Sequence, residues 1–262
     1  MVKKEQMSGG NVHQTYKLDD KVYRNTSGNP NIHLLLQHLQ HKNFSYTPKF
    51  FGVVNNQEVL SYIPGYVPGD KYPSCPNYIW STDNLIEAAK ILRQFHDLTV
   101  DFLKNNLNSN WELNIFSEDE QQVICHNDFA PYNFVYMDTR IIGLIDFDMV
   151  SPGPRIFDIA YALYTIVPLS SFQFDDRGNI RKYQSFDALI RRQRINLFFE
   201  AYQMPRPDNL KQWIIRRLIV LCDYIDKRAK LGNKAFEKMK KEGTIEYYRQ
   251  EINFIEQNFD DW

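Results

Sequence analysis

Five polar side chains near the middle of the chain are of the types that phosphoryl transfer requires. His126, Asp128 and Asn133 fall within one polar segment, and Asp146 and Asp148 follow a short apolar run. A carboxylate such as that of Asp128 can accept a proton from an attacking hydroxyl group. The oxygens of Asn133 and Asp146 suit a hard cation such as Mg²⁺, which also binds phosphate oxygens. Phosphoryl transfer needs positioning, metal charge and a base, and this set would supply all three.

Short apolar segments around these residues predict the strands that position them. The segments 123–125, 134–136 and 141–145 are rich in β-branched and aromatic residues, which is typical of strands. Residues 138–140 predict the turn of a hairpin between the second and third strands. A loop between buried strands that carries several acidic and amide side chains makes a poor core. The pattern therefore indicates a functional site.

Other polar residues nearby have structural interpretations of equal or greater weight. Asp148 either assists a metal ion or caps the next segment, and Asp158 is expected to order the loop or cap the following helix. His96 closes a helix with an apolar face, where a histidine is usually packed and hydrogen-bonded, so we expect a structural role for it.

Composition sets the limits within which the site must be interpreted. The chain has 262 residues, enough for two lobes with their own cores, and its 43% hydrophobic and 24% charged residues are ordinary for a soluble globular protein. A net charge of −1 gives no general basic field for nucleic acid. No run approaches the ~18 apolar residues of a membrane helix, and the three cysteines lack metal spacing. We expect a cytoplasmic protein with neither nucleic acid nor membrane as partner.

Two kinds of organisation follow each other along the chain. Residues 1–63 predict a β-rich lobe with one helix that begins at Ile32 and strands at 21–24, 50–54 and 58–63. Pro-Gly pairs at 64–65 and 68–69 predict a linker over residues 64–76. Residues 77–262 predict a mainly helical lobe. Its expected helices span 81–97, 157–167, 188–202, 210–230, 234–241 and 245–259, with a polar loop at 170–183.

The central motif resembles that of a known enzyme family. His-Asn-Asp-Phe-Ala-Pro-Tyr-Asn at 126–133, followed by Ile-Asp-Phe-Asp at 145–148, resembles the HxDxxxxN catalytic loop and the metal-binding Asp of the protein-kinase-like fold. It is most similar to the version in aminoglycoside phosphotransferases and choline kinases. The resemblance implies an α+β, two-lobed fold with a small antiparallel β lobe, one helix in that lobe, and a larger helical lobe.

The resemblance also implies roles for individual residues. Asp128 would be the base or would orient the acceptor hydroxyl, Asn133 and Asp146 would bind Mg²⁺, and Arg24 would contact the phosphates of ATP or GTP. His126 would brace the catalytic loop without reacting. The nucleotide would also be covered by a loop containing Gly9 and Gly10, and its base would meet backbone groups of Ser61, Tyr62 and Ile63.

The N-terminal lobe departs from the family pattern at two points. The phosphate-binding cation is usually Lys, whereas here the sequence offers Arg24, or Lys21 earlier in the same run. The helix that normally supplies a Glu partner contains none, and His33 is its nearest polar candidate. Taken alone, His33 and His38 fit a solvated helix face better than a site.

The leading hypothesis is a Mg²⁺-dependent small-molecule kinase, and its acceptor stays open. A polycationic aminoglycoside would need carboxylates such as Asp175, Asp176 and the acidic segment 256–262, whereas a choline-like substrate would need an aromatic cage. Sugar and amino-acid hydroxyls are further options. An alternative is a catalytically silent nucleotide-binding scaffold. A protein substrate is disfavoured, because the segment 146–158 is too short for a peptide-binding activation loop.

Overall fold

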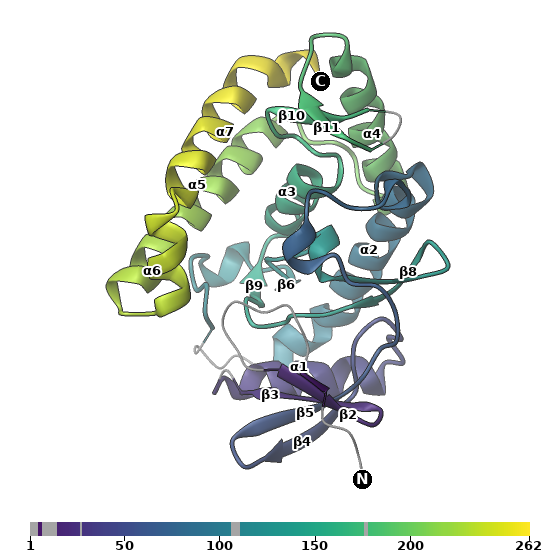
Figure 1. Cartoon of the computed structure of the whole chain (residues 1–262), viewed down its shortest axis with the longest axis vertical. Helices are drawn as coiled ribbons and strands as arrows, with labels where there is room; N and C mark the ends of the chain where they lie inside the picture. The colour runs from purple at the N-terminus through teal and green to yellow at the C-terminus, as the bar shows by residue number, and fades with distance from the viewer. Residues whose placement is uncertain (1–4, 7–14, 27, 106–110, 176–177) are drawn as a thin grey trace. The chain divides into compact units, whose positions relative to one another are not determined.

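The computed structural model describes residues 5–6, 15–26, 28–105, 111–175 and 178–262 (Figure 1). Within these residues the fold combines a five-stranded antiparallel sheet, three two-stranded sheets and seven α-helices. The chain divides into two compact units, one formed by residues 1–72 and 90–158, the other by residues 73–89 and 159–262. All of the polar residues of the central motif therefore lie in the first unit.

The five-stranded sheet of the first unit has the strand order β1-β2-β3-β5-β4. Its strands are β1 (Glu5–Gln6), β2 (Thr15–Leu18), β3 (Lys21–Asn25), β4 (Phe50–Val54) and β5 (Gln57–Ser61). Asn55 and Asn56 join β4 to β5 with φ values of 51° and 61°. Asparagine tolerates this left-handed conformation, which matches the twist of a two-residue hairpin.

Helix α1 (Pro30–His41) connects β3 to β4 and lies beside the sheet (Figure 1). It begins two residues before the predicted start at Ile32, because the Asn29 side chain caps it by accepting a hydrogen bond from Asn31 N–H and Pro30 occupies the first turn. Its apolar face is fully buried through Ile32, Leu35, Leu36 and Leu39. This burial leaves the histidines of α1 on its flanks.

Two short antiparallel pairs carry the central motif. Strand β6 (Val123–Cys125) pairs with β9 (Ser151–Gly153), and β7 (Phe134–Met137) pairs with β8 (Arg140–Leu144). The three strands predicted here are confirmed. The turn between β7 and β8 is formed by Asp138 and Thr139, both with positive φ.

Helix α2 (Thr82–Asn105) is longer than the sequence predicted. We expected it to close at His96-Asp97, and that expectation is wrong. Phe102 and Leu103 continue the buried stripe of the helix beyond Asp97, with 2% and 8% of their surfaces exposed. Of the two residues at the predicted end, Asp97 lies on the exposed face and His96 is buried, so neither interrupts an amphipathic helix.

The second unit contains most of the predicted helices within one or two residues of their expected ends. The elements after β9 are α3 (Arg155–Ile166), β10 (Phe172–Phe174), β11 (Ile180–Lys182), α4 (Asp187–Tyr202), α5 (Leu210–Lys230), α6 (Lys234–Lys241) and α7 (Thr244–Asn258). The loop predicted over residues 170–183 is wrong, because β10 and β11 pair there as a hairpin. Each strand has only three residues, too short a run for alternation to be recognised.

Among the described residues, no helix has both the length and the apolar character needed to cross a membrane.

Candidate active site

The carboxylate of Asp128 is held by two side chains of its own loop. Tyr132 donates its hydroxyl to one oxygen, at 2.5 Å. Asn133 donates its amide nitrogen to the other oxygen at 2.8 Å, and also to the main-chain oxygen of Asp128 at 2.9 Å. The 3₁₀ turn Pro131–Asn133 brings these residues back beside Asp128. The Asp128 carboxylate is thus half-buried with a fixed orientation, as a base that must meet an incoming hydroxyl requires.

The start of this loop is anchored by Asp158, at the beginning of α3. Its buried carboxylate accepts the backbone N–H groups of His126 and Asn127 at 2.6 and 2.9 Å. The ring of His96 lies 3.0 Å from the same carboxylate. Burial would raise the pKa of Asp158, but the hydrogen bond from His96 and the charge interactions outweigh it and lower the pKa. Asp158 therefore orders the loop that begins at His126, one of the two roles we expected for it.

His126 is packed beneath the loop and stays neutral at physiological pH. Burial lowers its pKa to about 4, despite the nearby Asp158 carboxylate. Its ring packs edge-on against Phe147 with centroids 4.8 Å apart, and its Nδ1 accepts the N–H of Asp128 at 3.3 Å. The structure thus gives His126 a bracing position and leaves Asp128 as the half-buried carboxylate of this loop.

Asp146 and Asp148 follow β8 and face the same loop. The N–H of Ile145 donates to the main-chain oxygen of Asn133 at 2.9 Å, which ties the two polar segments together. Asp146 adopts a positive φ of 66°, a conformation that aspartate tolerates and that is often found at functional sites. Partial loss of solvent, with 45% of the side chain still exposed, and the adjacent Asp148 carboxylate raise the pKa of Asp146, although Arg24 acts against this.

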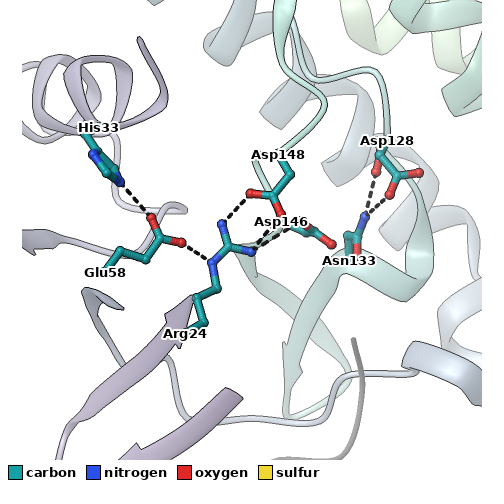
Figure 2. A network of polar contacts seen from close by, with 7 residues as sticks. All are labelled: Arg24, His33, Glu58, Asp128, Asn133, Asp146 and Asp148. Atoms are coloured by element: carbon teal, nitrogen blue, oxygen red, sulfur yellow. Dashed lines mark hydrogen bonds and ion pairs between the residues drawn. The ribbon is translucent and has the colours of Figure 1, made fainter. Parts of the chain in front are cut away.

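Arg24 is the cation that reaches these two aspartates (Figure 2). Its Nη2 lies 2.7 Å from Asp148 Oδ1, and its Nη1 lies 3.4 Å from Asp146 Oδ1. Burial alone would lower the pKa of Arg24, but the carboxylates of Asp148, Asp146 and Glu58 raise it. Lys21, the other sequence candidate, instead places its ammonium 5.1 Å from the ring centroid of Phe51. Arg24 is therefore the better placed of the two cations.

Glu58, which sequence reasoning missed, completes the network together with His33, the polar candidate that the sequence offered on the helix. Glu58, on β5, accepts a hydrogen bond from Arg24 Nε, and its other oxygen lies 3.0 Å from His33 Nε2. The expectation that His33 and His38 form a solvated helix face is wrong. His38 Nε2 hydrogen-bonds the main-chain oxygen of Leu98 at 2.8 Å.

The oxygen groups of this region fit a hard divalent cation. Arg24 offsets only one of the three carboxylates of Glu58, Asp146 and Asp148, and 45% of the Asp146 side chain is exposed. Because the amide nitrogen of Asn133 is turned toward Asp128, its amide oxygen points away from that carboxylate. The excess negative charge and the raised pKa of Asp146 are what a bound Mg²⁺ would relieve.

The predicted nucleotide contacts differ in how far the structure describes them. Gly9 and Gly10 lie outside the described residues. At the end of β5, Ser61 N–H donates to Lys49 O at 2.9 Å and Tyr62 N–H donates to Asp20 O at 2.7 Å. These two N–H groups are used within the first unit. The binding of a base at Ser61, Tyr62 and Ile63 stays a prediction.

Two of the acidic residues considered for a cationic acceptor, Asp175 and Asp260, have partners within the second unit. Asp260 lies 2.7 Å from the Lys211 ammonium, and Trp262 is buried, with 3% of its surface exposed. Asp175 accepts hydrogen bonds from the backbone and side chain of Asn179 at 2.8 and 3.0 Å. Asp176 lies outside the described residues. This segment therefore has structural partners of its own.

Comparison with known proteins places these features in a family context. Residues 76–189 match the model of the phosphotransferase enzyme family. The trifolitoxin immunity protein of Rhizobium leguminosarum bv. trifolii is 25% identical over 210 residues, covering 76% of this chain and 74% of that protein.

Several solved structures share the fold at low sequence identity. A choline kinase from Cryptosporidium parvum has a TM-score of 0.60 at 12% identity, covering 99% of this chain and 89% of that one. An aminoglycoside phosphotransferase in complex with gentamicin gives 0.59 at 13% identity, with coverages of 97% and 91%. A spectinomycin phosphotransferase in complex with ADP and spectinomycin gives 0.58 at 12% identity, with coverages of 99% and 92%.

These comparisons confirm the predicted resemblance and the protein-kinase-like fold. The matched family is one of phosphotransferases, the enzyme class that the sequence predicted.

Proposed function

We propose that this chain, whose residues 76–189 match the phosphotransferase enzyme family, is a Mg²⁺-dependent small-molecule kinase. It would transfer the γ-phosphoryl group of ATP or GTP to a hydroxyl group. The observation that carries the proposal is the placement of Asn133, which bonds the Asp128 carboxylate at 2.8 Å and is tied through its backbone to the segment bearing Asp146. This placement supports the assignment of Asp128 as the base and of Asn133 and Asp146 as the metal ligands.

The residues would divide the reaction among them as follows. Asp128 accepts the proton of the acceptor hydroxyl as that oxygen forms a bond to the γ-phosphorus and the bond from the γ-phosphorus to the bridging β–γ oxygen breaks. Asn133 and Asp146 would hold Mg²⁺, which would supply positive charge to the phosphate oxygens. The Arg24 fork would contact phosphate oxygens of the nucleotide.

A catalytically silent nucleotide-binding protein is the second candidate, and the Arg24 network favours it. The guanidinium group bonds both Asp148 and Asp146, the second of which is a proposed metal ligand. A guanidinium that never left these carboxylates would compete with the metal ion. The two candidates differ in turnover: the kinase consumes nucleotide in the presence of an acceptor, and the silent protein binds it unchanged.

The experiment that separates them is a transfer assay with γ-labelled ATP and GTP. The acceptors would be aminoglycosides, choline, ethanolamine and sugar alcohols, together with trifolitoxin because of the relative named for immunity to it. We expect labelled product with at least one acceptor, reduced roughly 10²- to 10⁴-fold in Asp128→Asn. The matched control is Asp138→Asn, in the exposed β7–β8 turn, which should retain activity. Equal activity in the Asp128→Asn variant would contradict the proposal.

A further inference from the structure

Four side chains from four elements form a series of contacts that runs from β4 to the guanidinium group of Arg24, beside Asp148. The ring of Phe50 on β4 stacks on His33 of α1, with centroids 4.3 Å apart and planes 11° from parallel. His33 Nε2 lies 3.0 Å from one oxygen of Glu58 on β5. The other oxygen accepts from Arg24 Nε on β3.

The sheet register explains why Glu58 meets Arg24. The two residues are direct partners across the antiparallel pair of β3 and β5, so their side chains project from the same face of the sheet. The stack on Phe50 fixes the plane of the His33 ring, and Figure 2 shows the ring edge directed at Glu58. Only 1% of the Glu58 side chain is exposed. A buried carboxylate of this kind depends on both of its partners.

The guanidinium group of Arg24 contacts carboxylates on two of its edges. Its Nε edge is bound to Glu58, whereas Nη1 and Nη2 face Asp146 and Asp148 at 3.4 and 2.7 Å. Because a guanidinium is a rigid planar fork, fixing the Nε edge also fixes the direction of the two Nη groups. Glu58 therefore sets the direction of the fork, and His33 holds Glu58.

We propose that His33 is a positioning residue for nucleotide binding: through Glu58 it holds the Arg24 fork toward the phosphate groups of a nucleoside triphosphate. This inference rests on the proposed function, because it requires a nucleotide beside Asp146. It also accounts for the sequence of α1, which has no glutamate between residues 30 and 41. A histidine on the helix and a glutamate on the strand together do what a single acidic helix residue would do.

The test compares His33→Leu with His33→Gln in the full chain. The amide nitrogen of glutamine can take the place of Nε2 as a donor to Glu58, whereas leucine cannot. We expect His33→Leu to weaken the affinity for Mg·ATP or Mg·GTP roughly tenfold, the size of effect expected for one hydrogen bond to a charged group. His33→Gln should stay within about threefold of the parent. His41→Leu, at an exposed position on the same helix, is the matched control and should bind as the parent does.

A second measurement reports on Arg24 without nucleotide. The Nε–H signal of Arg24 in the ¹⁵N NMR spectrum, assigned by its loss in Arg24→Lys, should shift in His33→Leu and not in His41→Leu. In turnover assays, KM for nucleotide should rise in His33→Leu with a smaller change in kcat. A merely structural role would lower the unfolding midpoint without this selective effect on KM.

The outcomes separate the inference from the function on which it rests. Parental nucleotide affinity, or an unmoved Nε–H signal, in His33→Leu would overturn the inference and leave the kinase proposal in place. Equal losses in the leucine and glutamine variants would overturn the hydrogen-bonding role of His33. If the parent protein binds neither ATP nor GTP, the inference and the proposed function fall together.

Discussion

The carboxylate of Asp158 offers a sharp test of how the catalytic loop is held. Its oxygens accept the N–H groups of His126 and Asn127 at 2.6 and 2.9 Å, and the ring of His96 lies at 3.0 Å. Asp158→Asn keeps the shape but replaces one acceptor oxygen with a donor. At least one buried N–H then loses its partner, which costs about 1–3 kcal/mol, and the remaining hydrogen bonds lose their charge assistance, about 0.5–1 kcal/mol each.

We therefore expect Asp158→Asn to lower the free energy of unfolding by about 3 kcal/mol, measured by urea titration at pH 7. The lowered pKa of Asp158 agrees with a loss of stability in this variant, because it means that the charged form of the carboxyl group stabilises the folded protein. Asp97→Asn is the matched control. Asp97 pairs with Arg93 and Arg155 but is 44% exposed, so its loss should cost less than about 1 kcal/mol. A cost for Asp158→Asn no larger than that of the control would refute the reasoning.

Three further predictions concern the loop and its surroundings. Acidification from about pH 6.5 to 4 should lower the free energy of unfolding by up to ~3 kcal/mol, because His126 takes up a proton in the unfolded state but, with a pKa of about 4, stays neutral in the folded state. Urea titrations at several pH values measure this change, and a free energy of unfolding that stays constant over this pH range would contradict the prediction. Tyr132→Phe should lower kcat severalfold and move the acidic limb of the pH–rate profile to higher pH, because the Asp128 carboxylate loses a donor that stabilises its charged form. An unchanged profile would contradict this. Gly65→Ala should lower the free energy of unfolding by about 2–4 kcal/mol, because the φ of Gly65 is +157° and an added Cβ would lie 2.6 Å from a carbonyl oxygen of β7. Gly28→Ala is the control and should lower it by about 1 kcal/mol, because an added Cβ there has no neighbour within 4 Å. Equal unfolding midpoints for the two variants would argue against the close approach at Gly65.

The strands and helices that carry the site were largely predictable because their signals are local. The strand runs around the central motif and the ends of α5 and α6 follow from periodicity and capping over a few residues. Of the predicted metal ligands, Asn133 lies five residues after Asp128 and Asp146 follows the end of β8, and a sequence motif can specify both positions.

The partner of Arg24 was not predictable in this way. Glu58 lies 34 residues away and meets Arg24 only through the register of β3 and β5, which no local pattern specifies. The family pattern places the acidic partner on the helix, whereas here α1 supplies His33 and strand β5 supplies the acid. The same limit explains why the end of α2 was placed too early. The residues after Asp97 mix polar with apolar side chains, and the fold buries Thr99, Phe102 and Leu103 among them.

Thermal unfolding with ATP or GTP, each with and without Mg²⁺, tests the central claim most directly. A nucleotide at ~100 times its dissociation constant stabilises the folded state by about 2.7 kcal/mol, and for a chain of this size each kcal/mol moves the midpoint by roughly 2–4 °C. We predict a Mg²⁺-dependent rise with at least one nucleotide that is lost in Asp146→Asn. The absence of any shift, or the same shift in Asp146→Asn as in the parent, would contradict the assignment of Asp146 as a ligand of the nucleotide-bound metal.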